Sequence, residues 1–270
     1  MKAIIVSMQD DAGMNIKQRL LENFDFKVSY KRFESFPVMN FKDFELYTIQ
    51  TDQIFANYVN EIKAELLIFA SMHKSKDEKP ALTAHAIGNF GKAEFGGEDN
   101  KIIPTIPSIL KNYLNSLKEK NEQKNLGFEV TMEATHHGPM LSKPTIFIEL
   151  GSNETGWKNE KAALAIAETI VEHTDASNKF IPSLGVGGNH YCSYFNKLQF
   201  DSQNAFGHVI AKYGLEALNS ELLQQAINAH TEKIQEIIVD EKGLGEHKEK
   251  VMKLLKETGI NVQKARAVEK

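Results

Sequence analysis

Short apolar segments alternate along the chain with longer segments in which apolar residues recur every three or four positions. The short segments are rich in β-branched and aromatic residues and are bounded by turn residues, a pattern that predicts β-strands. The strands predicted in this way span residues 2–7, 44–50, 65–71, 127–132, 144–151, 180–185 and 206–210.

The longer segments have the spacing of amphipathic helices. In residues 107–120, Leu110, Leu114 and Leu117 lie on one face, and a proline stands where a helix tolerates it, near the start. In residues 156–173 the apolar positions recur in the same way, with Thr155 expected as the N-cap. Further helices are predicted at residues 15–24, 218–227 and 251–255.

The interleaving of strands and helices favours an α/β fold in which a sheet is covered on both faces. No repeat and no Gly/Ser/Pro-rich linker divides the 270 residues, so we expect a single domain over 1–270. Two polar stretches, near 73–97 and 118–125, are expected to be loop insertions on it.

Composition narrows the class of protein. Hydrophobic content is 41% and charged content 25%, as in soluble globular proteins, and apolar runs such as 66–70 are too short to cross a bilayer. The N-terminus has the pattern of a strand rather than of a signal peptide. A single cysteine, Cys192, excludes an internal disulfide framework and fits a reducing compartment. We therefore expect a soluble cytoplasmic protein with no membrane partner.

Charge gives a weaker indication of partners. The formal net charge of −4 does not point to nucleic acid in general, and DNA is not expected as a partner. Cations are nevertheless concentrated in the last thirty residues, where interspersed glutamates also fit an ordinary solvated helix face. These cations are Lys242, Lys248, Lys250, Lys253, Lys256, Lys264, Arg266 and Lys270.

The most informative polar residues lie where predicted strands end. Glu149 stands inside an apolar strand, where an unpartnered carboxylate costs several kcal/mol, so it needs a cation or hydrogen-bond donors. His136 and His137 precede Gly138 and Pro139, and histidines near a turn serve as metal ligands or proton shuttles. Alternatively, the pair braces the turn and backbone amides satisfy Glu149.

Other histidines occupy similar positions, and strand ends of an open α/β sheet tend to form one site. Six of the nine histidines do so: His73, His85, His136, His137, His190 and His208. The alternatives are that His73 and His85 are satisfied loop residues and that His208 is a core histidine. Glu154 either serves the site or favours the helix that follows it.

Two further features bear on the chemistry. Gly187 and Gly188 allow a close backbone approach and expose N–H groups, although a lone Gly-Gly is a weak signal. Cys192 and His190 form a conceivable nucleophilic pair, but a small buried cysteine is commoner. The residue types favour hydrolysis by water activated on a His/carboxylate-bound zinc ion, with ligands from separate loops because no compact zinc signature occurs.

Several motifs, in order along the chain, resemble the archaeal and plant type of D-aminoacyl-tRNA deacylase. They are Ser-Met-His-Lys-Ser at 71–75, Pro-Ala-Leu-Thr-Ala-His-Ala-Ile-Gly-Asn at 80–89, Ala-Thr-His-His-Gly-Pro at 134–139, Phe-Ile-Glu-Leu-Gly-Ser from 147 and Gly-Gly-Asn-His-Tyr at 187–191. One departure is visible, since Cys192 and Ser193 stand where such proteins usually continue with Ala-Pro.

The resemblance implies a single three-layer α/β domain of the phosphorylase/hydrolase-like kind, with a mixed sheet between helices. It also implies a zinc-dependent hydrolase that cleaves the ester bond of D-aminoacyl-tRNA and releases free D-amino acid and tRNA. On this basis we assign roles to the polar positions of the motifs. The assigned roles are catalytic for His137 and Glu154, substrate binding for His73, His85, Asn89, Gly187, Gly188 and Tyr191, and zinc binding for His136, Glu149 and His190.

Two rival functions remain open on the sequence alone. One is a metal-dependent amidohydrolase or peptidase acting on a small substrate, which needs no basic docking surface. The other is a non-catalytic tRNA-binding module whose histidines serve structure, and which binds no zinc. The number of metal ions and the oligomeric state do not follow from the sequence.

Overall fold

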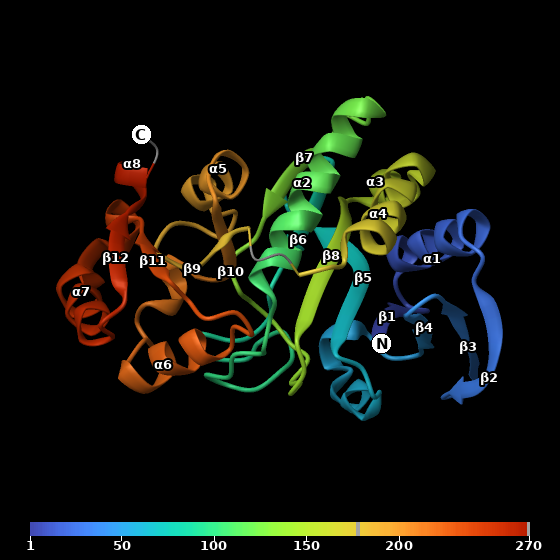
Figure 1. Cartoon of the computed structure of the whole chain (residues 1–270), viewed down its shortest axis with the longest axis horizontal. Coiled ribbons are helices and arrows are strands. Elements are labelled where there is room, and N and C mark those ends of the chain that lie inside the picture. The colour runs from blue at the N-terminus through green and yellow to red at the C-terminus, as the bar shows by residue number, and fades with distance from the viewer. Residues whose placement is uncertain (177–178, 269–270) are drawn as a thin grey trace.

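The computed structural model describes residues 1–176 and 179–268, and within them the strands form two sheets (Figure 1). The larger sheet has eight strands in the order β2-β3-β4-β1-β5-β8-β6-β7, and the smaller has four in the order β10-β9-β11-β12. The strands are β1 (Lys2–Ser7), β2 (Lys27–Phe33), β3 (Phe36–Phe41), β4 (Phe44–Ile49), β5 (Leu66–Lys74), β6 (Ala81–His85), β7 (Glu129–Met132), β8 (Thr145–Ser152), β9 (Ile181–Val186), β10 (Asn204–Ile210), β11 (Glu236–Val239) and β12 (Asn261–Lys264).

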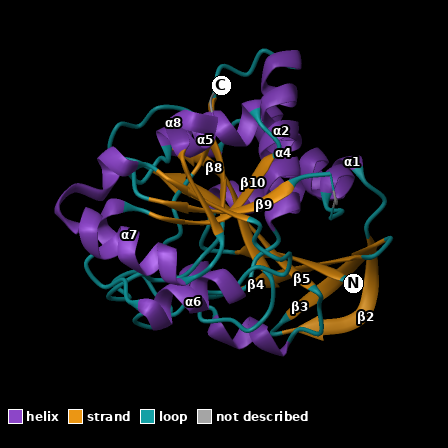
Figure 2. Cartoon of the chain, turned by 60° about the vertical axis from the view of Figure 1, so that its left-hand side comes forward, coloured by secondary structure: helices purple, strands orange, loops and turns teal. Residues whose placement is uncertain are grey.

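Long helices cover one face of the larger sheet and both faces of the smaller one (Figure 2). Four short 3₁₀ helices, η1 (Gln53–Phe55), η2 (Asn57–Glu61), η3 (Lys212–Gly214) and η4 (Glu241–His247), complete the described structure. The α-helices are α1 (Asp11–Asn23), α2 (Pro107–Gln123), α3 (Glu154–Trp157), α4 (Glu160–His173), α5 (Ser193–Asp201), α6 (Ser220–Asn228), α7 (Lys248–Glu257) and α8 (Ala265–Val268).

The central strands of the larger sheet are buried on both faces, which explains their continuous apolar sequences. In β1, Ile4 and Val6 belong to the core that also contains residues of α1, α2 and α4, whereas Ala3 and Ile5 face the opposite side. That opposite side is covered by η1, η2 and the segments around residues 87–103 and 140–141, and not by long helices. The side with loop cover is also the one that carries the candidate active site.

The smaller sheet is entirely parallel and has helices on both faces. Leu184, Val186 and Ile237 pack with α6 and α7, while Phe206 and Ile238 belong to the core shared with α2 and α5. This second sheet was not predicted, because β11 and β12 are only four residues each and therefore too short to show a clear periodicity.

The predicted α/β class, with a mixed sheet packed between helices and connecting segments, is confirmed. All seven predicted strands exist with small shifts of their ends, and the predicted helix at 156–173 is divided into α3 and α4. Two loop predictions differ from the structure: 73–97 contains the end of β5 and all of β6, and 118–123 belongs to α2. The edge hairpin β2–β3 was missed; its first strand, β2, is largely exposed and mostly polar, so it lacks an apolar run. None of the helices in the described part of the chain has the length and apolarity needed to span a membrane.

Candidate active site

Glu149 lies in the middle of the larger sheet, where three adjacent strands set its surroundings. The register of β8 places it opposite Ser71 of β5 on one side and Thr83 of β6 on the other. Ser71 Oγ donates to Glu149 Oε1 over 2.9 Å, and Thr83 Oγ1 donates to Oε2 over 3.3 Å. The buried carboxylate predicted from the apolar strand is therefore partnered by side-chain hydroxyls from both neighbouring strands.

The two-residue period of a strand then positions two histidines on the same face. His73 follows Ser71 by two residues on β5, and His85 follows Thr83 by two residues on β6. Because β5 is parallel to β8 and β6 is antiparallel to it, these histidines flank Glu149 from opposite directions. His73 Nδ1 lies 3.4 Å from Glu149 Oε2, and His85 Nε2 lies 3.6 Å from Glu149 Oε1.

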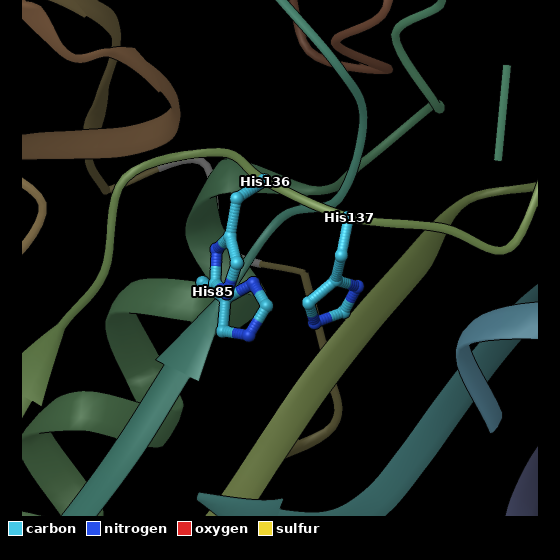
Figure 3. Close-up of side chains that lie close together, drawn as sticks. All are labelled: His85, His136 and His137. Atoms are coloured by element: carbon cyan, nitrogen blue, oxygen red, sulfur yellow. The ribbon is translucent and has the colours of Figure 1, made fainter. Parts of the chain in front are cut away.

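His136 and His137 reach the same place from the loop that follows β7 (Figure 3). Their rings lie 4.4 Å and 5.0 Å, respectively, from the ring of His85, between centroids. His137 has a φ of 50°, a left-handed conformation that non-glycine residues adopt at an energetic cost of about 1–2 kcal/mol. Gly138 makes this turn possible, since a Cβ there would meet Ile54 O at 2.5 Å.

The tautomers of the three clustered imidazoles are set by the backbone. His85 Nδ1 donates to Ala86 O over 3.2 Å, His136 Nδ1 to Ala134 O over 2.8 Å, and His137 Nδ1 to Gly138 O over 2.6 Å. In the neutral form of each ring, Nε2 is thus left with a lone pair, the arrangement in which a second hydrogen bond orients a metal-ligating histidine. Because the three rings are held in fixed orientations, their Nε2 atoms offer a metal ion one defined arrangement of ligands.

Glu133 is a central member of the cluster that the sequence pattern did not single out. Its side chain is 1% exposed, and it contacts His73 Nδ1 at 3.0 Å, His190 Nε2 at 2.8 Å and His136 Nε2 at 3.8 Å. The sequence feature that could have indicated Glu133 is its position, three residues before His136 at the end of a predicted strand. His190 arrives from the loop after β9, and its Nδ1 is 3.2 Å from the hydroxyl of Tyr213.

Burial opposes charge on His73, Glu133 and Glu149, so their pKa values depend on their partners. Burial lowers the pKa of His73, but the hydrogen bonds to Glu133 and Glu149 outweigh it and raise that pKa to about 10. For Glu133, burial is likewise outweighed, and the imidazoles of His190 and His73 hold its pKa well below the usual range.

The paired histidines respond in the opposite way. Burial, and then the charge of His85, lowers the pKa of His137 to about 4, and the same two causes lower the pKa of His136 well below its usual value. Both imidazoles are therefore neutral at physiological pH. A neutral imidazole is the form that binds a metal ion.

Three overlapping sets of side chains have donor atoms within 4.8 Å of one another: His85 with His136 and His137, Glu133 with His136 and His190, and His73 with Glu133 and Glu149. Two buried atoms of these sets, His85 Nε2 and Glu133 Oε1, have no hydrogen-bond partner in regular geometry among the described residues. These two atoms are held only by ion-pair contacts, Glu133 Oε1 with His73 and His85 Nε2 with Glu149, and a bound cation would give each of them a further partner. The residues therefore fit a divalent metal ion, and imidazole nitrogens with carboxylate oxygens suit zinc.

Comparisons with known proteins show the family of the chain. Residues 60–263 match the model of the family described as D-aminoacyl-tRNA deacylase. The chain is 40% identical to the D-aminoacyl-tRNA deacylase of Pyrococcus abyssi over 96% of its own length and 98% of that protein. It is 35% identical to the one of Archaeoglobus fulgidus, over 100% of its own length and 98% of the relative.

This chain belongs to the D-aminoacyl-tRNA deacylase family. The resemblance carried by the histidine motifs is confirmed. A crystal structure described as a conserved protein of unknown function, AF0625, superposes with a TM-score of 0.91 at 34% identity, covering 99% of this chain and 96% of that one. The α/β fold of this chain is therefore shared with that protein.

Most of the residues assigned from the family motifs converge, in a grouping that differs from the predicted one. His136 and His190 meet at Glu133 rather than at Glu149, and Glu149 groups with His73. His137, predicted as catalytic, lies with His85 and His136 in the three-imidazole set. Together with part of β5 these residues, except the fully buried His85, border a cavity of about 490 Å³.

Two of the predicted positions do not point into that cavity. Glu154 is at the exposed start of α3, where its carboxylate pairs with Lys158, so the structure favours the helix-terminus alternative. Asn89 is buried, and its side-chain amide donates to Gly96 O over 3.0 Å and to Glu98 O over 3.3 Å. It thereby holds the loop that carries Phe95 to the cavity wall.

The remaining predicted residues lie at the margin of the site. Tyr191 donates its hydroxyl to Ser75 Oγ over 2.9 Å, with its ring 6.2 Å from that of His73. Gly187 packs against the segment that begins at Asp240, because a Cβ on it would meet Asp240 O at 2.6 Å. Gly188 lines a second, neighbouring cavity.

His208 supports the site without facing the cavity, in accord with the core-histidine alternative. Its Nδ1 is 3.0 Å from Thr135 Oγ1, and Thr135 N donates to Val209 O over 3.0 Å. His230 accepts a hydrogen bond from the backbone N–H of His208 over 3.0 Å. This buried network fixes the strand end that leads directly into His136.

A second carboxylate that the sequence pattern did not single out also borders the 490 Å³ cavity. Asp10 caps α1 by accepting from Gly13 N over 2.6 Å, and it accepts from Met72 N over 2.8 Å. Burial, opposed by these two hydrogen bonds, raises the pKa of Asp10 to about 7, and the nearby charges of Glu149 and Asp52 contribute to the rise.

Proposed function

We propose that this chain hydrolyses the ester bond of D-aminoacyl-tRNA, releasing the free D-amino acid and tRNA, with the assistance of bound zinc, and that it acts in the cytoplasm. The observation that supports this proposal is the convergence of three imidazoles, each oriented through Nδ1 by a backbone carbonyl, beside the buried carboxylates of Glu133 and Glu149. Family membership supplies the substrate class.

The zinc-holding residues we propose are His85, His136 and His137 through their Nε2 atoms, with Glu133 beside them. Zinc bound there supplies Lewis-acid polarisation of the ester carbonyl and a lowered pKa of bound water. Because an aminoacyl ester is already activated, modest assistance suffices. The strained backbone of His137 is consistent with a position maintained for function.

His190 and Glu133 form the pair best placed to move a proton. Glu133 Oε2 is 2.8 Å from His190 Nε2, and the side chain of His190 is 35% exposed, at the border of the cavity. A histidine hydrogen-bonded to a buried carboxylate is a suitable acid for the ribose oxygen that leaves when the ester bond breaks. In this division of roles His190 acts on the leaving group, whereas the sequence motifs suggested zinc binding.

The cavity also suits the amino acid part of the substrate. Phe147 and Phe95 contribute apolar surface, while Asp10, Asp52 and Gln53 line another part of the wall. The buried Oε1 of Gln53 has no hydrogen-bond partner among the described residues. An α-ammonium group supplies both a donor for that oxygen and a charge that complements the carboxylates. Fixing the ammonium and the ester at separate points makes the direction of the side chain, and hence chirality, decisive.

The direct test is to incubate the purified protein with D-tyrosyl-tRNA and L-tyrosyl-tRNA and to follow release of tyrosine. We expect release from the D-substrate only, loss of activity after exhaustive chelation, and recovery when zinc is returned. Metal analysis of the purified protein should show bound zinc. Equal hydrolysis of both stereoisomers, or full activity after chelation together with no bound metal, would contradict the proposal.

A further inference from the structure

A second cavity, of about 770 Å³, opens beside the first. The two have one lining residue in common, His190, which therefore stands between them. An ester of tRNA joins two chemically different groups, an amino acid and a terminal ribose. A hydrolytic centre for such an ester needs a compartment on each side of the bond, and the second cavity is in the required position for the nucleoside.

The lining of this second cavity matches a nucleoside followed by phosphates. The side chain of Tyr213 is 56% exposed at the cavity wall, which leaves its ring face available to a base. Aromatic faces of this kind stack on bases without regard to sequence. The carboxylates of Glu216 and Asp240 offer acceptors for ribose hydroxyls or an exocyclic amine.

Two lysines of the same wall are without a partner for their ammonium groups in the part of the chain that the structure describes. The ammonium groups of Lys212 and Lys242 form no hydrogen bond or ion pair with any other described residue, in contrast to Lys248 and Lys264, which both pair with Glu241. Unpaired ammonium groups beside an aromatic ring are suited to phosphate, which they bind as point charges.

A third hollow, of about 240 Å³, continues from the second and shares Asp240 and Lys242 with it. Its lining adds the cations Lys248, Lys264 and Arg266 together with Glu241, which pairs with both lysines, so three cations against one carboxylate leave this part of the path positive. A strand of RNA leaving the second cavity would follow this path with its backbone against positive charge.

We propose that the second cavity binds the 3′-terminal adenosine of the tRNA, with its base on Tyr213 and the phosphates that precede it on Lys212 and Lys242. This inference rests on the proposed function and adds to it the site of the RNA end. The ester then lies at His190, with the amino acid in the 490 Å³ cavity and the terminal nucleoside in the 770 Å³ cavity.

The test uses the trinucleotide CCA, labelled at its 5′ end, as a ligand for the full chain, with binding measured by fluorescence anisotropy at low and moderate salt. We expect Tyr213→Ala to raise Kd about tenfold or more, the scale of base–aromatic stacking, and Tyr213→Phe to retain binding. Lys242→Ala should weaken binding and reduce the slope of log K against log salt by about 0.7 for each phosphate that the lysine neutralises.

Lys253→Ala is the matched control, since Lys253 is an exposed lysine of α7 that lines none of the three cavities. It should bind CCA as the wild type does. Thermal melting of each variant separates impaired binding from impaired folding. If Tyr213→Ala is unfolded, Tyr213→Phe is measured in its place, and the inference requires that this variant still binds CCA.

Each result has one meaning for the inference. If the wild type does not bind CCA, or if Tyr213→Ala and Lys242→Ala bind it as tightly as the wild type, the second cavity is not the nucleoside site, even where D-tyrosyl-tRNA is hydrolysed. If CCA binding depends on these residues but no D-aminoacyl-tRNA is hydrolysed, the nucleoside site stands and the proposed activity fails.

Discussion

The two cavities that meet at His190 are built on different physical principles. In the smaller one the polar side chains are buried and tied to one another or to the backbone, as Glu149 is tied to Ser71 and Thr83. In the larger one the charged groups are exposed, and Lys212 and Lys242 have no partner in the described structure.

This difference corresponds to two tasks. Hydrogen bonds fix the imidazoles before any substrate arrives, which is the preorganisation that catalysis requires. Exposed lysines keep their rotamer freedom and their hydration, so they contribute affinity that salt screens and geometry hardly constrains. Substitutions in the smaller cavity should therefore change rate constants, and substitutions in the larger one should change binding.

The largest expected effect is that of His136→Ala. Removing an imidazole that belongs to two of the three possible metal-binding sets should lower kcat/KM roughly 10²–10⁴-fold and reduce the zinc content. Steady-state deacylation of D-tyrosyl-tRNA with metal analysis measures both. Glu154→Gln is the matched control, because that carboxylate is exposed and remote from the cavity lining. If His136→Ala kept the wild-type kcat/KM, the proposal that side chains of the smaller cavity determine rate constants would be wrong.

Glu133→Gln tests whether electrostatic coupling holds the smaller cavity together. The substitution keeps the shape of the side chain but removes the charge that raises the pKa of His73. In the metal-free protein the pKa of His73 should fall from about 10 toward 6.5, and NMR titration of the imidazole measures it. We expect a loss of about 10²-fold in kcat as well. An unchanged His73 pKa would show that Glu133 is not its main partner.

His230 makes a buried part of the supporting network sensitive to acid. Burial lowers the pKa of His230 to about 4 from 6.5, so between these values the unfolded chain binds the proton and the folded chain does not. Its contribution to the free energy of unfolding is therefore present above pH 6.5 and is lost as the pH falls to about 4, by about 3 kcal/mol. Urea unfolding at several pH values should show a shallower decline for His230→Asn than for the wild type.

A smaller effect is expected from the double substitution Lys212→Ala and Lys242→Ala. Because these lysines are exposed, KM for D-tyrosyl-tRNA should rise about three- to tenfold at low salt with kcat nearly unchanged. The difference from the wild type should shrink as salt is added. A fall in kcat with constant KM would place these lysines in the chemical step and contradict the comparison of the cavities.

The smallest effect is expected for Cys192→Ala. The thiol is buried, burial raises its pKa well above the usual value, and Sγ donates to His190 O at 3.5 Å. Such a thiol is a poor nucleophile, so the variant should keep its rate within about twofold. A large loss of rate, together with inactivation by a thiol reagent, would revive the Cys192–His190 pair that the sequence suggested.

Much of the site could be predicted because its residues break the local pattern of the chain. Glu149 interrupts an apolar strand, and His136 and His137 lie together before a Gly/Pro turn, so each can be recognised from its neighbours in the sequence. Glu133 and Asp10 do not stand out, since a polar residue at the end of a strand or the start of a helix is ordinary. Their importance comes from burial, which a single sequence does not display.

For the C-terminal cations, the sequence showed the cluster but not its role. The sequence placed them together but did not distinguish a solvated helix face from an RNA surface. The structure separates Lys242 and Lys264, which line hollows, from Lys253, which does not, while Lys270 lies outside the described residues.

The sequence by itself determined the alternation of strands and helices, the set of chemical groups available, and the family to which the chain belongs. Only the tertiary structure decided which carboxylate meets which imidazole. That choice depends on strand order and direction: β8 lies between the parallel β5 and the antiparallel β6, so His73 and His85 approach Glu149 from opposite sides. Strand order results from packing of the whole core, so the sequence around any one strand does not reveal which strands lie beside it.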